Sequence, residues 1–203
     1  MGVDVQGLKA AVAEHGRVTR VVVAAIRVSS PREAGAAMLV WDSGQSGTIG
    51  GGTLEFEAAR SARTQTAATV LSRHALGPDM GQCCGGAVTL LSEVYDAARV
   101  AELPEDGVIA RPAAEDAPAR MPFPVKRLAA IARGQGQAPE PQLVDGWMVE
   151  PVHKRETQLW IWGAGHVGRA LVDVLSPLPD LAITWVDTGP ERFPGEIPAH
   201  VTP

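Results

Sequence analysis

The sequence has few cysteines, no excess of basic residues and no long apolar run. Two cysteines among 203 residues are too few for the disulfide framework of a small secreted domain. A formal net charge of −5 argues against the basic face that nucleic-acid binding needs. No apolar run reaches the length of a membrane span, and the first residues lack the basic and apolar segments of a signal peptide. We therefore expect a cytoplasmic globular protein, with neither nucleic acid nor a membrane as a partner.

The first hundred residues carry the apolar spacing of helices and the β-branched runs of strands. Apolar residues on one face predict a helix over residues 5–14. Apolar runs rich in β-branched residues predict strands over residues 20–28 and 36–41, which can pair as a long-looped hairpin, and over residues 87–95. An alanine-rich stretch predicts a helix over residues 54–74. Together these elements predict an α+β domain over residues 1–98.

Three successive glycines, Gly50, Gly51 and Gly52, precede this last predicted helix, and Glu55 follows them. Neither strand nor helix propensity explains the glycines, because each costs backbone entropy on ordering. One interpretation is a tight connection between a strand and a helix. The other is a loop that lets an anion or another ligand approach a helix N-terminus. The sequence leaves both interpretations open.

The two cysteines are adjacent, as Cys83 and Cys84, and Gly85 and Gly86 follow them. Adjacent Cα atoms lie about 3.8 Å apart, below the usual ~4.4–6.8 Å of a disulfide, so a bond between these thiols would be strained and labile. One cysteine can simply pack in the core, whereas the glycines that clear space around the thiols favour a functional role. The five histidines show no zinc-ligand spacing, so we predict no metal site.

Residues 99–156 differ in composition from the rest of the chain, because seven of the sixteen prolines lie between Pro104 and Pro141. We expect a partly extended connecting region here rather than a further core. Within it, the pattern favours a short helix over residues 125–133 and a small hairpin around Asp145-Gly146.

A strand-like run over residues 158–162 leads into Gly163, Gly165 and Gly168, which have the spacing G-x-G-x-x-G. This spacing is typical of a turn whose backbone N–H groups approach a phosphate at a helix N-terminus. His166, inside the turn, either faces solvent or contacts the ligand.

A second apolar run over residues 181–186 ends at Asp187, 19 residues beyond Gly168. At this spacing a carboxylate accepts the ribose hydroxyls of a bound nucleotide. The turn and the two runs predict the beginning of a Rossmann-like parallel βαβ domain over residues 157–203, and the fold class is α/β. A doubly wound sheet needs several more βα units. We therefore expect an incomplete domain, whose sheet is completed by the N-terminal domain or a second copy if the chain is not a fragment.

Several motifs occur together in this chain. They are Ser30-Pro31-Arg32, Gly50-Gly51-Gly52-Thr53-Leu54-Glu55, Cys83-Cys84-Gly85-Gly86, Gly163-Ala164-Gly165-His166-Val167-Gly168, and Val186-Asp187 with Arg192-Phe193-Pro194. This combination resembles the XdhC/CoxI family, the accessory factors of xanthine dehydrogenase and related molybdenum hydroxylases. The resemblance implies an XdhC/CoxI-like N-terminal domain followed by a Rossmann-like one. It also implies a molybdenum-cofactor chaperone that binds the molybdopterin cofactor as cargo, presents it to a cysteine desulfurase for sulfuration, delivers it to the apo-hydroxylase and self-associates.

The resemblance implies that these motifs hold the cofactor. The terminal phosphate of molybdopterin suits the N–H groups of the glycine turn. A thiolate of Cys83 or Cys84 suits the soft molybdenum centre or sulfur handling, and Glu55 or Arg32 suits the pterin edge. The expected cofactor-binding residues are Arg32, Gly50, Gly51, Gly52, Glu55, Cys83, Cys84, Gly85, Gly86, Gly163, Gly165, His166, Gly168 and Asp187.

Two other classes of protein stay open. An NAD(P)-dependent oxidoreductase would use the glycine turn and Asp187, although no catalytic acid–base set accompanies the turn. A thiol-redox protein would use Cys83 and Cys84, although these lack the C-x-x-C spacing. We therefore predict a chaperone without catalytic residues of its own, with NAD(P) as the alternative ligand.

Overall fold

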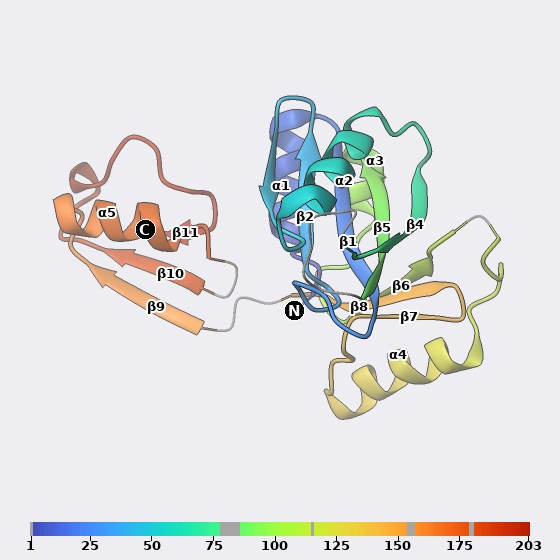
Figure 1. The fold of residues 1–203 in the computed structure, drawn as a ribbon. Coiled ribbons are helices and arrows are strands. Elements are labelled where there is room, and N and C mark those ends of the chain that lie inside the picture. Colours follow the sequence, from blue (N-terminus) through green and yellow to red (C-terminus); the bar gives the residue numbers. More distant parts are fainter. Residues whose placement is uncertain (1, 78–85, 115, 154–156, 179–180) are drawn as a thin grey trace. The chain divides into compact units, whose positions relative to one another are not determined.

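The computed structural model describes the chain apart from residues 1, 78–85, 115, 154–156 and 179–180 (Figure 1). The chain divides into two compact units, Met1–His153 and Lys154–Pro203, which we call unit 1 and unit 2. No helix in the described part of the chain has the length and apolar character to cross a bilayer.

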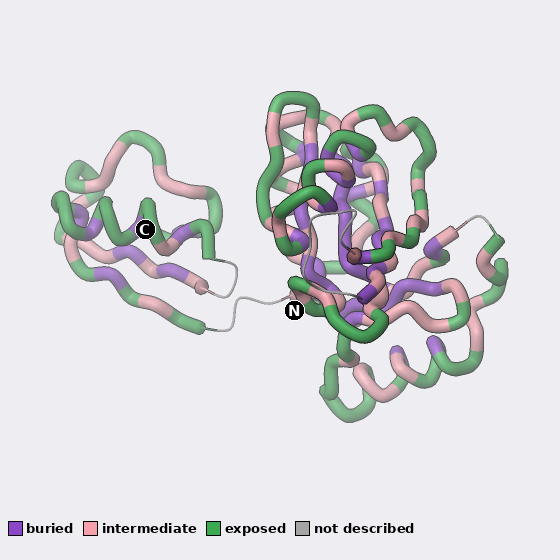
Figure 2. Tube along the Cα trace, in the orientation of Figure 1, coloured by how far each residue is buried: buried purple, intermediate pink, exposed green. Residues whose placement is uncertain are grey.

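Unit 1 is built on a five-stranded antiparallel sheet of order β3-β2-β1-β5-β4. Its central strand β1 carries the near-continuous apolar run seen in the sequence, and Val21, Val22 and Val23 are fully buried (Figure 2). The predicted hairpin pairing of the first two strands is confirmed. The elements of this part are α1 (Val5–His15), β1 (Val18–Arg27), β2 (Ala37–Trp41), β3 (Gly44–Gly47), α2 (Gly52–Thr64), β4 (Thr69–Ala75), β5 (Ala87–Tyr95) and α3 (Ala97–Ala101).

The helix predicted over residues 5–14 is confirmed as α1. It begins after Asp4, whose carboxylate accepts a hydrogen bond from the Gly7 N–H at 2.8 Å, and Gly16 ends it at φ 74°. The helix predicted over residues 54–74 is wrong in its second half. α2 ends at Thr64, and residues 69–75 form β4, which pairs antiparallel with β5. Residues 69–75 form a strand because their backbone groups hydrogen-bond to the edge of β5, a distant pairing that local propensity does not reveal.

The proline-rich segment is not a connecting region. It contains β6 (Val108–Pro112), α4 (Phe123–Gln135), β7 (Gln142–Val144) and β8 (Trp147–Pro151), which form a three-stranded antiparallel sheet of order β6-β8-β7 and one helix. The prolines mark element ends: Pro112 ends β6, and Pro122 and Pro124 begin α4. The helix expected over residues 125–133 and the hairpin at Asp145-Gly146 are both confirmed.

The second sheet of unit 1 packs between the first sheet and α4. On β8, Met148 belongs to a buried cluster with Val22 and Leu91 of the large sheet. Trp147 and Val149, on the other face of β8, pack with α4 residues. Because successive side chains of β8 point to opposite faces, this fully buried strand packs against the large sheet on one side and against α4 on the other.

Charged side chains are buried between these two sheets. Arg20 on β1 is 4% exposed and binds the fully buried carboxylate of Glu150 on β8 with two hydrogen bonds, of 2.7 and 3.0 Å. Arg111 on β6 binds Glu150 at 2.6 Å and also Glu93 on β5 at 2.5 and 2.7 Å. Arg99 approaches Glu93 at 3.4 Å. Each carboxylate has two guanidinium partners, which offset the cost of burying it.

Unit 2 is a parallel sheet of order β11-β10-β9 with one packed helix. Its elements are β9 (Thr157–Trp162), α5 (His166–Leu175), β10 (Leu181–Val186), the 3-10 helix η2 (Pro190–Arg192) and β11 (Val201–Thr202). The α/β class and the parallel βαβ arrangement are confirmed, and the short third strand was not predicted. Ile161, Val172, Ile183 and Trp185 form the centre of its core.

Candidate functional site

The glycine turn of unit 2 connects β9 to α5, and its first and third glycines are needed for its shape. Gly163 has φ 101°, a conformation that residues with a Cβ rarely adopt. Its N–H donates to the carbonyl of Val186 at 2.7 Å, and its carbonyl accepts the indole N–H of Trp185 at 3.0 Å. A Cβ on Gly168 would overlap that same carbonyl oxygen. Two hydrogen bonds between Gly163 and residues of β10 therefore fix the conformation of the turn.

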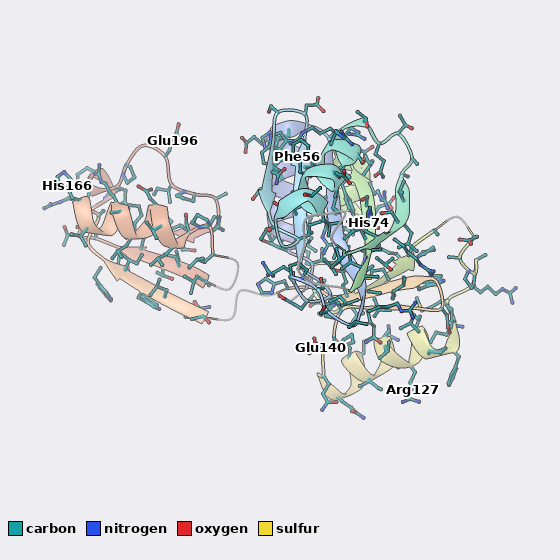
Figure 3. All side chains as sticks on the ribbon, viewed as in Figure 1. Phe56, His74, Arg127, Glu140, His166 and Glu196 are labelled. Atoms are coloured by element: carbon teal, nitrogen blue, oxygen red, sulfur yellow. The ribbon has the colours of Figure 1, made fainter. Side chains whose placement is uncertain are left out.

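The second glycine, Gly165, faces open space. A Cβ built on it has no atom within 4 Å, and the residue is exposed. α5 begins at His166 without a side-chain cap, so its first N–H groups are not satisfied by a capping side chain. An anion at this helix end would meet backbone N–H donors that no side chain caps and the positive end of the helix dipole. His166 is also exposed (Figure 3), which fits either interpretation of it.

Asp187, at the end of β10, contacts the glycine turn. Its carboxylate accepts the N–H of Ala164 at 2.6 Å, the N–H of Thr188 at 2.6 Å and the Thr188 hydroxyl at 3.1 Å. The bond from Ala164, followed by those from Thr188, lowers the pKa of Asp187. A carboxylate has about four acceptor sites, so these three bonds leave capacity for one further donor such as a ribose hydroxyl.

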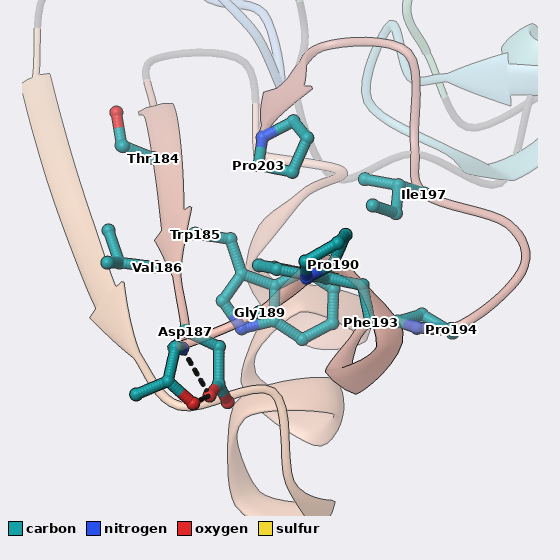
Figure 4. A pocket seen from close by; sticks show the side chains of 11 residues that line it. Thr184, Trp185, Val186, Asp187, Gly189, Pro190, Phe193, Pro194, Ile197 and Pro203 are labelled. Atoms are coloured by element: carbon teal, nitrogen blue, oxygen red, sulfur yellow. Dashed lines mark hydrogen bonds between the residues drawn. The ribbon is translucent and has the colours of Figure 1, made fainter.

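A hollow of about 640 Å³ adjoins Asp187 (Figure 4). Rings and apolar side chains dominate its lining, with Trp185 and Phe193 in edge-to-face contact, their ring centroids 5.2 Å apart. Its lining residues are Thr184, Trp185, Val186, Asp187, Thr188, Gly189, Pro190, Phe193, Pro194, Ile197 and Pro203.

In unit 1, the segment that follows β1 lies against two glycines from distant parts of the sequence. A Cβ on Gly50 would lie 2.6 Å from Cβ of Pro31, and a Cβ on Gly86 would overlap the carbonyl oxygen of Ser29. The structure thus brings Ser30-Pro31-Arg32, Gly50 and Gly86 together, and we call these residues the glycine corner. Arg32 pairs with its neighbour Glu33 at 3.2 Å.

The glycine corner also has two unusual features. Val28, which directly precedes Ser29, has φ 72° and is 96% exposed, although β-branched residues rarely adopt positive φ. The hydroxyl oxygen of Ser30 is buried and has no hydrogen-bond partner in the described part of the chain. Cys83, Cys84 and Gly85, which the sequence placed in the candidate site, lie outside the described residues.

Glu55 occupies the position that the sequence suggested for a bound anion. Its carboxylate accepts the N–H groups of Ile49 and Gly51 at 2.9 and 3.0 Å and the hydroxyl of Thr48 at 2.5 Å. Burial raises its pKa, but the bonds from Thr48, Gly51 and Ile49 outweigh this and leave the pKa lowered. The glycine run is therefore held by a carboxylate of the protein itself, and the sequence did not reveal this contact.

We expect Glu55→Ala to lower the free energy of unfolding of unit 1 by about 1–2 kcal/mol, because Thr48, Ile49 and Gly51, just before α2, lose their shared acceptor. Glu57→Ala, on the same helix, removes a carboxylate outside this loop and serves as the control. Denaturant unfolding measures both. Equal losses for the two variants would contradict the role given to Glu55.

Among the described residues no group of three histidine, cysteine or acidic side chains is arranged to hold a metal ion. The buried network of Arg20, Glu93, Arg111 and Glu150 was missed by the sequence interpretation. A single charged residue carries no local signal of a partner that is distant in the sequence.

Comparison with known proteins finds a similarity in the first half of unit 1. The model of the XdhC and CoxI family matches residues 11–74, from α1 to β4, which include Arg32, the glycine run and Glu55. A crystal structure described as a xanthine dehydrogenase from Bacillus halodurans has a TM-score of 0.63 at 18% identity, over 95% of this chain and 64% of that one. The chain therefore spans 64% of that protein's length, and the likeness shows the fold. No curated protein matches the chain. Residues 11–74, about a third of the chain, are therefore similar to the XdhC and CoxI family.

Proposed function

We propose that the protein is an accessory factor that binds the molybdenum cofactor, supports its sulfuration and delivers it to a molybdenum hydroxylase of the xanthine dehydrogenase type. The observation that carries the proposal is the family match over residues 11–74, which contains most of the glycine corner. The proposed partners are the apo-hydroxylase, a cysteine desulfurase and a second copy of the chain. The cofactor is cargo in this proposal, and no turnover by the protein itself is needed.

Each unit, taken by itself, offers one feature that suits a part of such a cargo. In unit 2, the open space at Gly165 and the uncapped start of α5 suit the terminal phosphate of the cofactor. In unit 1, the buried Ser30 hydroxyl, which has no partner among the described residues, and the neighbouring Arg32 suit the polar edge of a pterin. Glu55 would then keep the glycine run in shape rather than contact the ligand. Cys83 or Cys84 would supply a thiolate for sulfur handling, a role argued from the sequence alone.

A second candidate is an NAD(P)-dependent oxidoreductase. The observation that favours it is the position of Asp187, which ends β10 beside the glycine turn as the ribose-binding carboxylate does in dinucleotide sites. The hollow beside Asp187 is also lined by rings and apolar side chains. Among the described residues this unit presents no acid–base pair near the turn.

The deciding experiment is equilibrium binding of the purified protein to molybdopterin cofactor, NAD and NADP in parallel. The proposal expects cofactor retention and its transfer to a purified apo-hydroxylase, with a higher sulfido content when the desulfurase is present. Tight nicotinamide binding without cofactor retention would replace the proposal with the second candidate.

We expect Gly165→Asp to weaken phosphate-dependent binding at least tenfold, because a carboxylate would enter the open space and repel the anion at the helix start. The control is Ala170→Asp, which adds the same charge to an exposed position later on α5. Isothermal titration measures both affinities. An unchanged affinity for Gly165→Asp would place the ligand away from this turn.

A further inference from the structure

The outward face of α4 carries positive charge and no negative charge. Lys126, Arg127 and Arg133 are exposed on it, and Figure 3 shows Arg127 on the side away from β7. Val125, on the opposite side, packs with Trp147 and Val149 of β8, and Ala129 is buried. With Arg120, residues 117–139 contain four basic residues and no acidic one. Because the whole chain carries −5 and this segment +4, the remaining residues carry −9, so the segment is opposite in sign to the rest of the chain.

Lys126 and Arg127 lie near the positive end of the helix dipole, whereas Arg133 lies in the last turn, where a cation is favourable. α4 has no acidic residue in its first turn and no side-chain cap, and Lys126 and Arg127 follow directly. Cations near a helix N-terminus are unfavourable, since the helix dipole is positive there. None of Arg120, Lys126, Arg127 and Arg133 makes an ion pair within the described part of the chain. An anionic surface placed over α4 would offset the unfavourable position of Lys126 and Arg127 near the helix N-terminus. It would also give the basic side chains ion-pair partners.

Phe123, at the start of α4, adds an apolar group to the same face. The residue is 77% exposed. It lies on the face that also presents Lys126 and Arg127. An exposed aromatic ring bordered by basic side chains has the composition of a protein-binding surface, in which the ring enters a pocket and the charges set orientation.

We propose that the outward face of α4, formed by Phe123, Lys126, Arg127 and Arg133, docks an acidic surface of a partner protein. A membrane is a poorer fit, because the apolar side of α4 is already packed on the sheet and Phe123 alone remains for insertion. A nucleic acid is a poorer fit as well, because four basic residues around one helix are a smaller basic surface than phosphate-based binding commonly uses. This face belongs to unit 1 and contains none of the residues proposed to bind the cofactor.

The test compares the full chain with two double charge reversals that change the net charge equally. Lys126→Glu with Arg127→Glu alters the docking face, and Arg60→Glu with Arg73→Glu alters exposed basic residues elsewhere in unit 1. Poly-L-glutamate serves as the acidic polypeptide probe, and phosphatidylserine vesicles and duplex DNA serve as the competing anions. Binding is measured by isothermal titration at low and at physiological salt.

We expect the unaltered chain to bind poly-L-glutamate in a salt-dependent manner, the α4 variant to lose about tenfold in affinity, and the control to lose less than about twofold. Equal losses for both variants would overturn the proposal, because the binding would then reflect net charge alone. Tighter binding to vesicles or DNA than to poly-L-glutamate would also overturn it. Circular dichroism of both variants excludes unfolding as the cause, and cofactor binding measured in parallel keeps this result separate from the proposed function.

Discussion

Glu150→Ala is expected to lower the free energy of unfolding of unit 1 by about 3–5 kcal/mol, the cost of breaking a buried ion pair by removing one partner. The carboxylate is fully buried and holds Arg20 with two hydrogen bonds and Arg111 with a third. Without it, two guanidinium groups between the sheets keep their charge, and Arg20 loses its ion-pair partner. One nitrogen of Arg111, Nη1, already lacks a partner in the described part of the chain, so the network has no spare acceptor.

The measurement is hydrogen exchange of amides on β1, β5 and β8, because it reports on unit 1 separately from unit 2. The control is Glu105→Ala, which breaks the exposed pair with Lys9, at 3.1 Å. Exposed pairs contribute about 0–1 kcal/mol, so this loss should be small. Comparable losses for Glu150→Ala and Glu105→Ala would show that the buried network contributes little to stability.

The same carboxylate gives an expected pH dependence. Burial raises the pKa of Glu150, but the charges of Arg20 and Arg111 outweigh it and lower the pKa from 4.5 to about 2. Because the folded-state pKa is depressed, this stabilisation is fully present above about pH 4.5 and is lost as the pH falls toward 2. The lowered pKa corresponds to about 3 kcal/mol. Glu150→Gln should flatten this part of the stability curve, whereas Glu105→Gln should leave it unchanged.

Gly168→Ala is the second substitution with a large expected effect, a loss of about 3 kcal/mol or more in the stability of unit 2. Its Cβ would overlap the carbonyl oxygen of Gly163, which accepts the indole N–H of Trp185. Inserting a methyl group into a packed site costs about 1–3 kcal/mol, and losing a buried hydrogen-bond partner costs about 1–3 kcal/mol more. A unit of this size has a total stability of only a few kcal/mol, so it should unfold in part.

The matched control is Gly165→Ala, because the same methyl group there meets no atom within 4 Å. The indole N–H resonance of Trp185 in a ¹H–¹⁵N spectrum reports on the turn directly. It should shift or disappear in Gly168→Ala and stay in place in Gly165→Ala. A native resonance in both variants would mean that the turn accommodates the overlap by moving.

Local sequence was enough to predict the glycine turn and the strands and helices around it. The spacing of Gly163, Gly165 and Gly168 follows from local requirements. Gly163 has a positive φ, Gly165 leaves space open, and Gly168 lies close to the Gly163 carbonyl oxygen. The same holds for α1, whose cap at Asp4 and end at Gly16 follow from neighbouring residues. The hairpin at Asp145-Gly146 is another case, since both residues have positive φ.

Predictions from local sequence were wrong where the structure of a segment depends on a partner distant in the sequence. Residues 69–75 were expected to be helical and form β4, because β5 supplies their hydrogen bonds. The proline-rich segment forms its own sheet, because its short strands pair with one another and pack on the larger sheet. Prolines there mark boundaries between elements rather than the absence of a core.

By itself, the sequence determined the two kinds of architecture, the family resemblance and the shape of the glycine turn, since all of these depend on periodicity and short spacings. Tertiary structure alone decided that Glu55 fills the glycine run, that Pro31 meets Gly50, and that Arg20 binds Glu150. Arg20 and Glu150 are 130 positions apart. A charge in a strand carries no mark of the partner it will meet, because that partner is chosen by the packing of two sheets rather than by neighbouring residues.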